Sequence, residues 1–414
     1  MSKDADGYSL AHKFSEDDHQ VYFWTQNPKY RIVGKGLNNP KPISEWQPYV
    51  NGVDIIIFDM VGMGKIASAL KKMGKPVLGG SILADQIEED RAYAQKVMKK
   101  YTGASIPEFK EFTNIMQGIA YLENAENPHV FKPLNNAPNS WTFVAKDDNE
   151  GLISFMEALP KQSLPYILQE KVDGIEISTE GWFNGKEFID GGWNHTFERK
   201  RLMNGDIGPQ TGSQGAIIFA NGENRLVKEF VKPLEKFLRA NNYVGPIDVN
   251  CIVNKDSAYF LEFCGRFGYH GIEPFCLLLK DDKADFFMNM AKGKNIEFKL
   301  NDEYSIAIRL SMNPLEGSDD LKGLKVLDMP GYLSPYVWLS YCIFDKEKNP
   351  LLSGADGMVG AVCTTGETID DVREEVYDII DTVSLTQDLQ YRTDIGAEVP
   401  EKMEKLIKWG WLNE

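Results

Sequence analysis

The sequence has few cysteines and no long apolar segment. Its cysteines are odd in number and have no paired spacing, which argues against a disulfide framework or a zinc site. No apolar run approaches the roughly 20 residues that span a bilayer. The opening MSKDADGYSL is acidic and polar, unlike a signal peptide. We therefore expect a cytoplasmic protein with no membrane partner. The cysteines are Cys251, Cys264, Cys276, Cys342 and Cys363.

Positive charge is also scarce. The chain has 45 Lys and Arg residues against 61 Asp and Glu residues, a net charge of -16. Binding to nucleic acid needs a basic surface that neutralises phosphates, so we expect no nucleic-acid partner. A small anion remains possible, because a local group of lysines and arginines can dominate its own pocket.

The patterns that are present predict a mixed α/β protein. The chain has 414 residues, 43% hydrophobic and 26% charged, which fits a soluble protein of two or three domains. Residues 53–60 form a continuous apolar run, 64–74 an amphipathic helical pattern and 75–81 a second strand pattern. This order predicts a βαβ unit. Residues 86–101 then predict one amphipathic helix.

The second half of the chain continues this alternation. Residues 225–242 predict a helix that Pro233 kinks or breaks. Residues 246–254 and 258–263 predict two strands of a hairpin joined by KDS. A further helix is expected over 368–383, with Thr368 as its N-cap.

Several short motifs have both a structural and a chemical interpretation. VGMGK lacks the early glycine and the Ser or Thr of a phosphate-binding P-loop, so a turn that opens a helix is preferred. Lys132, in FKP, taken alone is best read as an exposed lysine at a strand edge. Residues 168–178 are either a charged hairpin or an extended linker suited to an adenine and a ribose. The basic triplet and glycine-rich loop over 198–216 favour an anion site over a solvated loop.

Two carboxylates on the predicted hairpin suggest a metal site. A three-residue turn would set Asp248 and Glu262 directly opposite on one face, whereas a two-residue turn would separate them. On one face they would repel each other unless a cation lay between them, and oxygen ligands suit Mg²⁺. The sequence leaves the register open.

Taken in order, these motifs resemble the ATP-grasp superfamily and, within it, the glycinamide ribonucleotide synthetase family. The similarity covers nearly the whole chain, and the order and spacing of the motifs are more specific than any one of them. The motifs are EEDRAYAQKVMKKYTGASIPEF, FKP, LQEKVDGIEIS, GPQTGSQGA, YFLEFCGRFG, GETIDDVREEVYDIIDTV and YRTDIG.

The resemblance implies three parts and a ligase activity. We expect an N-terminal α/β domain over 1–86, an ATP-grasp domain over 87–299 with its smaller lobe at about 107–178, and a small C-terminal α/β domain over 300–414. The implied reaction joins glycine, or another amino acid, to a phosphoribosylamine-like amine through an acyl phosphate, with ATP and Mg²⁺ (or Mn²⁺). A monomer or homodimer is expected.

The resemblance also implies roles for individual residues. Arg266 and Lys200 would be catalytic. The substrate pocket would also contain Arg201, Thr211 and Gly212. ATP would contact Arg91, Lys132, Glu170, Lys171, Val172 and Glu176. The metal ligands would be Glu262 and Asp248, together with the position of Cys264.

The chain departs from the family pattern at several positions. Cys264, a soft ligand, replaces an asparagine, and residues 134–141 replace the usual glycine- and lysine-rich phosphate loop. The usual first strand of the N-terminal domain is missing or rebuilt. Two alternatives therefore remain: a ligase of the same mechanism for another amine or carboxylate, or a degenerate nucleotide-binding protein that is not an enzyme.

Overall fold

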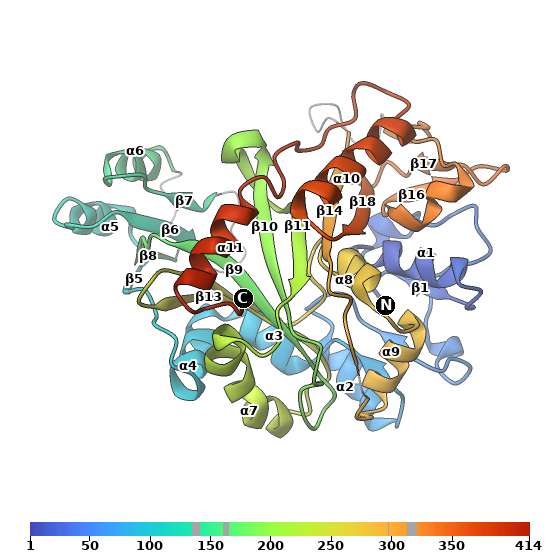
Figure 1. The fold of residues 1–414 in the computed structure, drawn as a ribbon, viewed down its shortest axis with the longest axis horizontal. Helices are drawn as coiled ribbons and strands as arrows, with labels where there is room; N and C mark the ends of the chain where they lie inside the picture. The colour runs from blue at the N-terminus through green and yellow to red at the C-terminus, as the bar shows by residue number, and fades with distance from the viewer. Residues whose placement is uncertain (135–140, 160–164, 297, 313–320) are drawn as a thin grey trace.

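The structure, a computed structural model, describes residues 1–134, 141–159, 165–296, 298–312 and 321–414. A large twisted sheet crosses the centre, a smaller sheet projects from it on one side, and the N-terminal segments cover the other side (Figure 1). In the described residues no helix has both the length and the apolar content needed to cross a membrane.

The large sheet has eight strands in the order β13-β12-β9-β10-β11-β14-β18-β15, and all neighbours are antiparallel. The middle parts of its central strands carry runs of buried, mostly apolar residues, so hydrophobic side chains are buried on both faces of the sheet. The strands are β9 (Ile175–Phe183), β10 (Asn194–Met203), β11 (Ile207–Ala220), β12 (Gly245–Val253), β13 (Ala258–Cys264), β14 (Tyr304–Ser311), β15 (Val337–Leu339) and β18 (Met358–Gly366).

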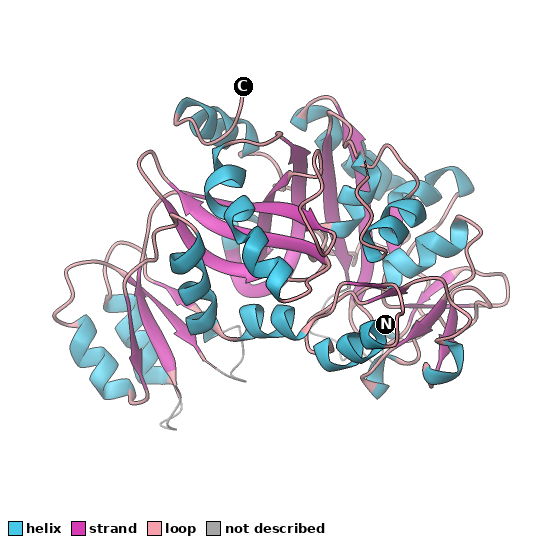
Figure 2. Cartoon of the chain, turned by 90° about the horizontal axis from the view of Figure 1, so that it is seen from below, coloured by secondary structure: helices cyan, strands magenta, loops and turns pink. Residues whose placement is uncertain are grey.

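The smaller sheet has four antiparallel strands in the order β5-β8-β6-β7. Two helices pack on it, and together they enclose a separate core that includes Phe131, Leu152 and Tyr166 (Figure 2). Residues 171–174 connect β8 directly to β9, so this short link joins the two sheets. The elements are β5 (Phe109–Phe112), β6 (His129–Pro133), β7 (Phe143–Val144), β8 (Tyr166–Glu170), α5 (Ile115–Leu122) and α6 (Glu150–Ala158).

The N-terminal segment contains two separate parallel pairs of short strands. β3 pairs with β4 across α2, which confirms the predicted βαβ unit, and β1 pairs with β2. α2 begins in the VGMGK turn, and the carboxylate of Asp85 accepts hydrogen bonds from the Gly62 and Gly64 amides at 2.7 and 2.9 Å. A protein anion therefore fills this turn. The elements are α1 (Tyr8–Glu16), β1 (Tyr22–Trp24), β2 (Lys41–Ile43), β3 (Ile56–Ile57), α2 (Gly64–Lys72) and β4 (Val77–Leu78).

The predicted helix over 86–101 is wrong in one respect, because two helices meet there. α3 (Ile82–Glu89) ends at Asp90, and α4 (Arg91–Tyr101) begins immediately after it. The Asp90 carboxylate accepts a hydrogen bond from the Tyr93 amide at 2.9 Å, so it caps the second helix while its own backbone is extended. The spacing of apolar residues continues through Asp90, so that spacing alone does not reveal the boundary between the two helices.

The predicted break at Pro233 is confirmed. A π-helical turn (Val227–Val231) leads into a 3₁₀ turn (Lys232–Leu234) and then α7 (Glu235–Ala240). The change in helical pitch removes the need for the hydrogen bond that proline cannot donate.

The predicted hairpin forms from β12 and β13, with Glu262 opposite Asn250 and Cys264 opposite Asp248. The register, which the sequence left open, is that of neither a two-residue nor a three-residue turn. Val253 pairs with Ala258, so the loop is residues 254–257, and a bulge follows Asn250. Since residues two apart share a face, Asp248 and Glu262 lie on one face, with Asp248 two residues away from the direct partner of Glu262.

The C-terminal segment is part of the same large sheet. β14 and β18 extend the sheet beyond β11, so strands from both sides of residue 300 are neighbours. The expected boundaries 1–86, 87–299 and 300–414 stay predictions. On α10 (Ile369–Val383) the predicted N-cap is confirmed, because the Thr368 hydroxyl accepts from the Asp371 amide at 3.1 Å.

The remaining elements complete this framework. The last helix, α11, leads to Trp411, whose indole nitrogen donates to the Asn254 carbonyl at 2.8 Å and so ties the chain end to the hairpin loop. These elements are α8 (Ile272–Leu278), α9 (Lys283–Ala291), β16 (Cys342–Phe344), β17 (Pro350–Leu352) and α11 (Val399–Lys408), with 3₁₀ turns at Pro28–Tyr30, Gln47–Tyr49, Asn204–Asp206 and Gly331–Tyr336.

Candidate active site

Lys200 is the centre of a cluster of carboxylates on one face of the large sheet. Its ammonium lies 3.1 Å from Glu262 Oε1, 3.4 Å from Glu176 Oε1 and 3.5 Å from Glu198 Oε2. The Asn250 amide donates to Glu176 Oε1 at 2.8 Å. Three neighbouring strands and the hairpin strand β13 supply these groups, so the sheet register holds them together.

The charges of this cluster are mutually stabilised. Burial alone would lower the pKa of Lys200, but Glu262, Glu176 and Glu198 raise it well above its ordinary value. Lys200 in turn lowers the pKa of Glu262 to about 2, against the effect of burial. Glu262 is therefore a carboxylate and Lys200 an ammonium at neutral pH.

Lys132 approaches the same cluster from the smaller sheet. Its ammonium donates to Gln169 Oε1 at 2.7 Å. Burial, and then the nearby Arg91, lower its pKa to about 8, while Glu262 and Glu176 oppose the shift. The three predicted residues Arg91, Lys132 and Glu176 thus come together where the two sheets face each other.

The predicted adenine-binding residues Glu170 to Val172 are the last residue of β8 and the first two residues of the link between the sheets. The Glu170 amide donates to the Glu108 carbonyl at 2.8 Å, and the Lys171 amide donates to the Pro128 carbonyl at the same distance. The Lys171 ammonium donates to the Lys146 carbonyl at 2.6 Å. Hydrogen bonds to chain segments on either side thus hold the start of the link in place. The contact of these residues with a nucleotide stays a prediction. The predicted phosphate loop, 134–141, lies outside the described residues except at its two ends.

The expected metal ligands are not assembled into a complete site by the protein alone. In the described part of the chain, no group of three or more His, Cys, Asp or Glu residues is arranged to hold a metal ion. Burial raises the pKa of Asp248 to about 8 and that of the Cys264 thiol well above its usual value. Glu262, which is ionised and 38% exposed, is the group of this set that fits a divalent cation. The roles of all three stay predictions.

Arg266 is held by a residue that the sequence did not reveal. Its Nε lies 3.1 Å from Glu88 Oε1, and Glu88 Oε2 accepts from the Gly265 amide at the same distance. The guanidinium also lies over the Tyr269 ring, 4.3 Å from its centre. Glu88, at the end of α3, therefore orients the arginine that was predicted to bind a substrate carboxylate. The acidic run before Arg91 was the available signal, but its partner is 178 residues away.

The predicted substrate loop is anchored from two sides. The Thr211 hydroxyl donates to the Lys200 carbonyl at 2.7 Å, and Arg201 donates to the Gly208 carbonyl at 2.7 Å. The buried Arg392, from the YRTDIG motif, donates to the Arg201 carbonyl at 2.9 Å. Gly212 lies against the Tyr269 ring, where an added Cβ would be 3.1 Å from the ring. The loop thus connects Lys200 with the region around Arg266.

A cavity of about 220 Å³ adjoins this region and adds residues that the sequence did not indicate. Its lining includes Gly212 and Tyr269, and it reaches the N-terminal segment and the C-terminal strands. Among the described residues that line it, Arg309 is the cation, and four acids accompany it. These acids are Asp6, Asp59, Glu273 and Asp356, and we call this cavity the acidic cavity. They are scattered over 350 residues of sequence, so no motif joins them.

Comparison with known proteins agrees with this geometry. The ATP-grasp (A) domain of phosphoribosylglycinamide synthetase matches residues 89–271. The chain is 24% identical to the phosphoribosylamine–glycine ligase of Helicobacter pylori (strain J99) over an alignment that covers 96% of this chain and 95% of that protein. It is also 24% identical to that of Caldanaerobacter subterraneus, with 94% and 97% covered.

Solved structures show the same fold. The crystal structure of phosphoribosylamine–glycine ligase from Thermotoga maritima matches with a TM-score of 0.69 at 18% identity, covering 95% of this chain and 98% of that one. The biotin carboxylase domain of 2-oxoglutarate carboxylase from Hydrogenobacter thermophilus, solved with MgADP, matches with a TM-score of 0.61 at 11% identity, covering 99% and 94%. The predicted ATP-grasp fold is confirmed. Residues 89–271 are therefore similar to the ATP-grasp (A) domain of phosphoribosylglycinamide synthetases.

Proposed function

We propose that this protein is an ATP-dependent carboxylate–amine ligase that joins glycine to 5-phosphoribosylamine and releases ADP and phosphate. The observation that carries the proposal is the junction of the two sheets, where Lys132 and Arg91 face the Lys200–Glu262–Glu176 cluster. The similarity to phosphoribosylamine–glycine ligases over nearly the full length supports the choice of substrates.

The residue types suit the phosphorylation of a carboxylate. A carboxylate is a poor electrophile, so ATP first converts it to an acyl phosphate, and an amine then displaces phosphate. Lys132 and Lys200 are cations that can hold the transferring phosphoryl group, whose charge grows on its outer oxygens. Arg266, fixed by Glu88 and Tyr269, can orient the substrate carboxylate for attack. The two sheets on either side of the link can exclude water from the acyl phosphate.

A divalent cation, Mg²⁺ or Mn²⁺, fits the ionised Glu262, and ATP phosphates would supply further oxygen ligands. When bound, the cation would neutralise phosphate charge. Asn250 lies opposite Glu262 and bonds Glu176, so it can keep these two carboxylates oriented. Cys264 points to the same face, but its protonated thiol is a poor ligand for a hard cation.

The testing experiment measures ADP release from Mg²⁺-ATP with glycine and 5-phosphoribosylamine, each omitted in turn, with products identified by mass spectrometry. We expect ADP only when both substrates are present, together with a glycinamide ribonucleotide peak. Absence of turnover despite measurable ATP binding would contradict the proposal. It would favour another substrate pair or a nucleotide-binding protein without activity.

The acidic cavity favours a second candidate: a ligase of the same mechanism for an amine that carries no phosphate. Four carboxyl groups line this cavity beside Arg309, and carboxylates repel a phosphate and attract a cationic amine. Burial raises the pKa of Asp6 to about 6 and that of Glu273 to about 7, which weakens this repulsion near neutral pH. A panel of amines in the same assay separates the two candidates.

The site of action and the assembly state are part of the same proposal. We infer a cytoplasmic enzyme that works as a monomer or homodimer. Sedimentation at assay concentration tests the assembly state.

A further inference from the structure

The acidic cavity has buried polar atoms that no protein group satisfies. Glu273 Oε2 and His270 Nδ1, on two residues of its lining, have no hydrogen-bond partner among the described residues. Each of these two residues is only 4% exposed. Asp59 Oδ1 is a third such atom on a lining residue. Since buried polar atoms in proteins are almost always paired, these atoms point to a ligand that donates hydrogen bonds.

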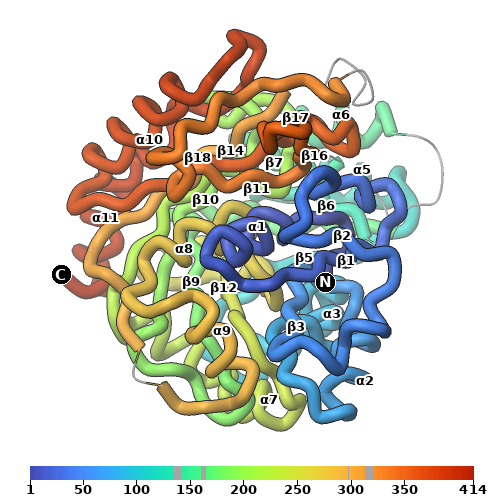
Figure 3. Tube along the Cα trace, turned by 90° about the vertical axis from the view of Figure 1, so that its right-hand side faces the viewer, coloured from blue at the N-terminus to red at the C-terminus, as the bar shows by residue number. Residues whose placement is uncertain are grey.

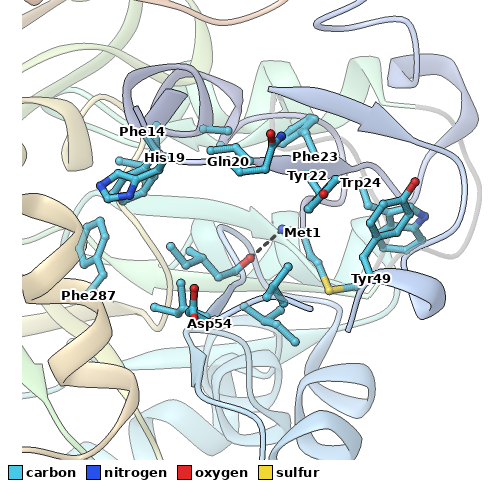
Figure 4. Close-up of a pocket in the computed structure, with 18 of the residues that line it drawn as sticks. Met1, Phe14, His19, Gln20, Tyr22, Phe23, Trp24, Tyr49, Asp54 and Phe287 are labelled. Atoms are coloured by element: carbon cyan, nitrogen blue, oxygen red, sulfur yellow. Dashed lines mark hydrogen bonds between the residues drawn. The ribbon is translucent and has the colours of Figure 1, made fainter. Parts of the chain in front are cut away.

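A larger cavity, between the N-terminal strand pairs, has a different lining (Figure 4). It has a volume of about 470 Å³, and aromatic side chains such as Tyr22, Trp24 and Tyr49 lie along it. Asp59 lines both cavities. Glu273, in contrast, lines the acidic cavity and not the larger one, so the search for a ligand starts from Glu273.

Two neighbouring carboxyl groups of the acidic cavity are held by neutral donors. Glu273 Oε1 accepts from the Ser9 hydroxyl at 2.9 Å, where α1 lies beside α8 (Figure 3). Asp6 accepts from the Tyr341 hydroxyl at 2.6 Å. Burial raises the pKa of Glu273 to about 7, and the nearby Asp6 carboxylate adds to this rise. A cation between the two groups would stabilise both as carboxylates.

The cation of the lining, Arg309, directs its hydrogen bonds to neutral oxygens. Its Nε donates to the Ser311 hydroxyl at 3.0 Å, and its Nη1 donates to the Ser213 carbonyl at 3.5 Å. The lining therefore keeps an excess of carboxyl groups, with four acids beside one arginine. Such a lining attracts a positively charged ligand and repels a phosphate.

An ammonium group suits this lining better than a metal ion does. In the part of the chain that the structure describes, no three His, Cys, Asp or Glu residues are arranged to hold a metal. A primary ammonium carries three N–H donors on one positive charge, so it can bind fewer protein acceptors. The volume of about 220 Å³ equals that of about seven water molecules in the liquid, which suits a ligand of about six or seven non-hydrogen atoms.

The acidic cavity also lies next to the predicted carboxylate-binding arginine. Gly212 and Tyr269 are part of its lining, and the Arg266 guanidinium lies 4.3 Å from the centre of the Tyr269 ring. Asp6 is close enough to Arg266 for the two charges to interact. A ligand anchored at Glu273 and Asp6 can thus direct its other end toward the carboxylate that Arg266 is proposed to orient.

We propose that the acidic cavity binds one ammonium group of a short α,ω-diamine through Glu273 and Asp6, and that the other amine of this diamine is the nucleophile of the ligase. The role of the diamine as substrate rests on the second candidate under the proposed function, whereas the ammonium site does not.

The reaction follows from this placement. The free amine, as its neutral form, attacks the carbonyl carbon of the acyl phosphate, and a C–N bond forms. The C–O bond to the phosphate breaks, and the phosphate leaves with that electron pair and takes up the proton that the amine loses. The anchored ammonium keeps its proton and does not react.

Calorimetric titration of the full chain without ATP tests the ammonium site. The probes are 1,4-diaminobutane, 1-aminobutane, 1-butanol and O-phosphoethanolamine. We expect the first two to bind, because each carries an ammonium on a short apolar chain. We expect no binding of 1-butanol, which has no charge, or of O-phosphoethanolamine, whose phosphate the carboxyl groups repel. No binding of the diamine, or equal binding of O-phosphoethanolamine, would overturn the proposal.

Variants connect this binding to the acidic cavity. Glu273→Gln keeps the size of the side chain and removes its charge, so it should weaken diamine binding by about tenfold or more. Asp6→Asn, at a half-buried position, should also weaken it and serves if the first variant does not fold. Glu229→Gln, at an exposed pair with Arg225, is the control and should bind normally. Normal binding in the folded cavity variants would overturn the site.

ADP release with ATP, glycine and each amine tests the substrate role. The diamine should give ADP and its N-glycyl derivative, identified by mass spectrometry. 1-Aminobutane should bind without giving product, because its single nitrogen is held as the ammonium. Diamine binding without product would overturn the substrate role. Absence of ADP with every amine, 5-phosphoribosylamine included, would instead overturn the ligase function, and the titration would still decide the ammonium site.

Discussion

The large sheet and the N-terminal strand pairs are built from similar apolar residues, but they are completed to different degrees. Each inner strand of the eight-stranded sheet has two partners, and its site residues are held by the register of four strands. The N-terminal pairs have two or three residues per strand and enclose a cavity of about 470 Å³. Long paired strands thus hold their side chains in a fixed register, whereas the short N-terminal pairs leave unpaired strand edges.

The largest effect is expected at the centre of the large sheet. Glu262→Gln removes the carboxylate nearest to Lys200, which we propose as a cation ligand, so turnover should fall by about 100- to 1000-fold. The fold should persist, because the side chain is 38% exposed. Steady-state kinetics measures the loss. Glu229→Gln, at an exposed pair with Arg225, is the matched control. Normal turnover in Glu262→Gln would remove this residue from the mechanism.

Core truncations compare the two regions directly. Ile308→Ala, in the fully paired sheet, should cost about 4 kcal/mol of unfolding free energy, since its packed surroundings cannot collapse. Ile56→Ala, on the wall of the cavity between the N-terminal strand pairs, should cost about 2 kcal/mol because space beside it is already open. Urea unfolding gives both values. Equal costs would mean that this cavity is closed in solution.

The arginine beside the large sheet should affect substrate affinity. Arg266→Ala should raise KM for the carboxylate substrate by about 30-fold or abolish turnover, because a bidentate partner is lost. Glu88→Gln should give a smaller rise, since it loosens the guanidinium without removing it. Substrate titrations of both variants provide the measurement. A change confined to ATP affinity would contradict the assignment.

The pH dependence of ATP binding should report Lys132. Its pKa is lowered to about 8, so the ammonium is present below pH 8 and is lost as pH rises through 8. KM for ATP should therefore increase above pH 8, by at most about tenfold per pH unit. Lys132→Arg keeps its charge and should flatten this rise. Parallel pH profiles in the two proteins would assign the effect to another group.

The smallest effect is expected at the N-cap of α10, a helix that packs on the large sheet. Thr368→Ala removes the cap of α10 and should cost about 1 kcal/mol, with activity unchanged. Thr382→Ala is the comparison, because its hydroxyl bonds a carbonyl within the helix at Asp378 and caps nothing. Thermal unfolding distinguishes them. A larger loss in Thr382→Ala would argue against the cap.

The sequence predicted what local patterns encode. Strand alternation, the Pro233 break and the Thr368 cap follow from neighbours within a few residues, and each is present. The boundary at Asp90 was missed because a capping side chain interrupts an otherwise unbroken apolar period. The hairpin register was left open because a bulge after Asn250 shifts it by one residue, and nothing local announces that bulge.

The candidate site was predictable where motifs carry it and hidden where the fold assembles it. Lys132, Lys200, Glu176 and Glu262 were named from motifs and come together in the structure. Glu88 was missed because its contact with Arg266 joins two segments whose separation follows from topology alone. The acidic cavity was missed for the same reason, since its residues come from both ends of the chain.

The continuity of the large sheet across residue 300 has a practical consequence. β11 lies before that point, and its neighbour β14 and the next strand β18 lie after it. Two fragments cut there would each expose a strand edge that only the other can cover. Expressed separately, the two fragments should be insoluble or inactive. Expressed together, they should pair along β11 and β14 and regain solubility and activity. The chain is therefore suited to a split-protein reporter whose signal depends on the meeting of its two halves.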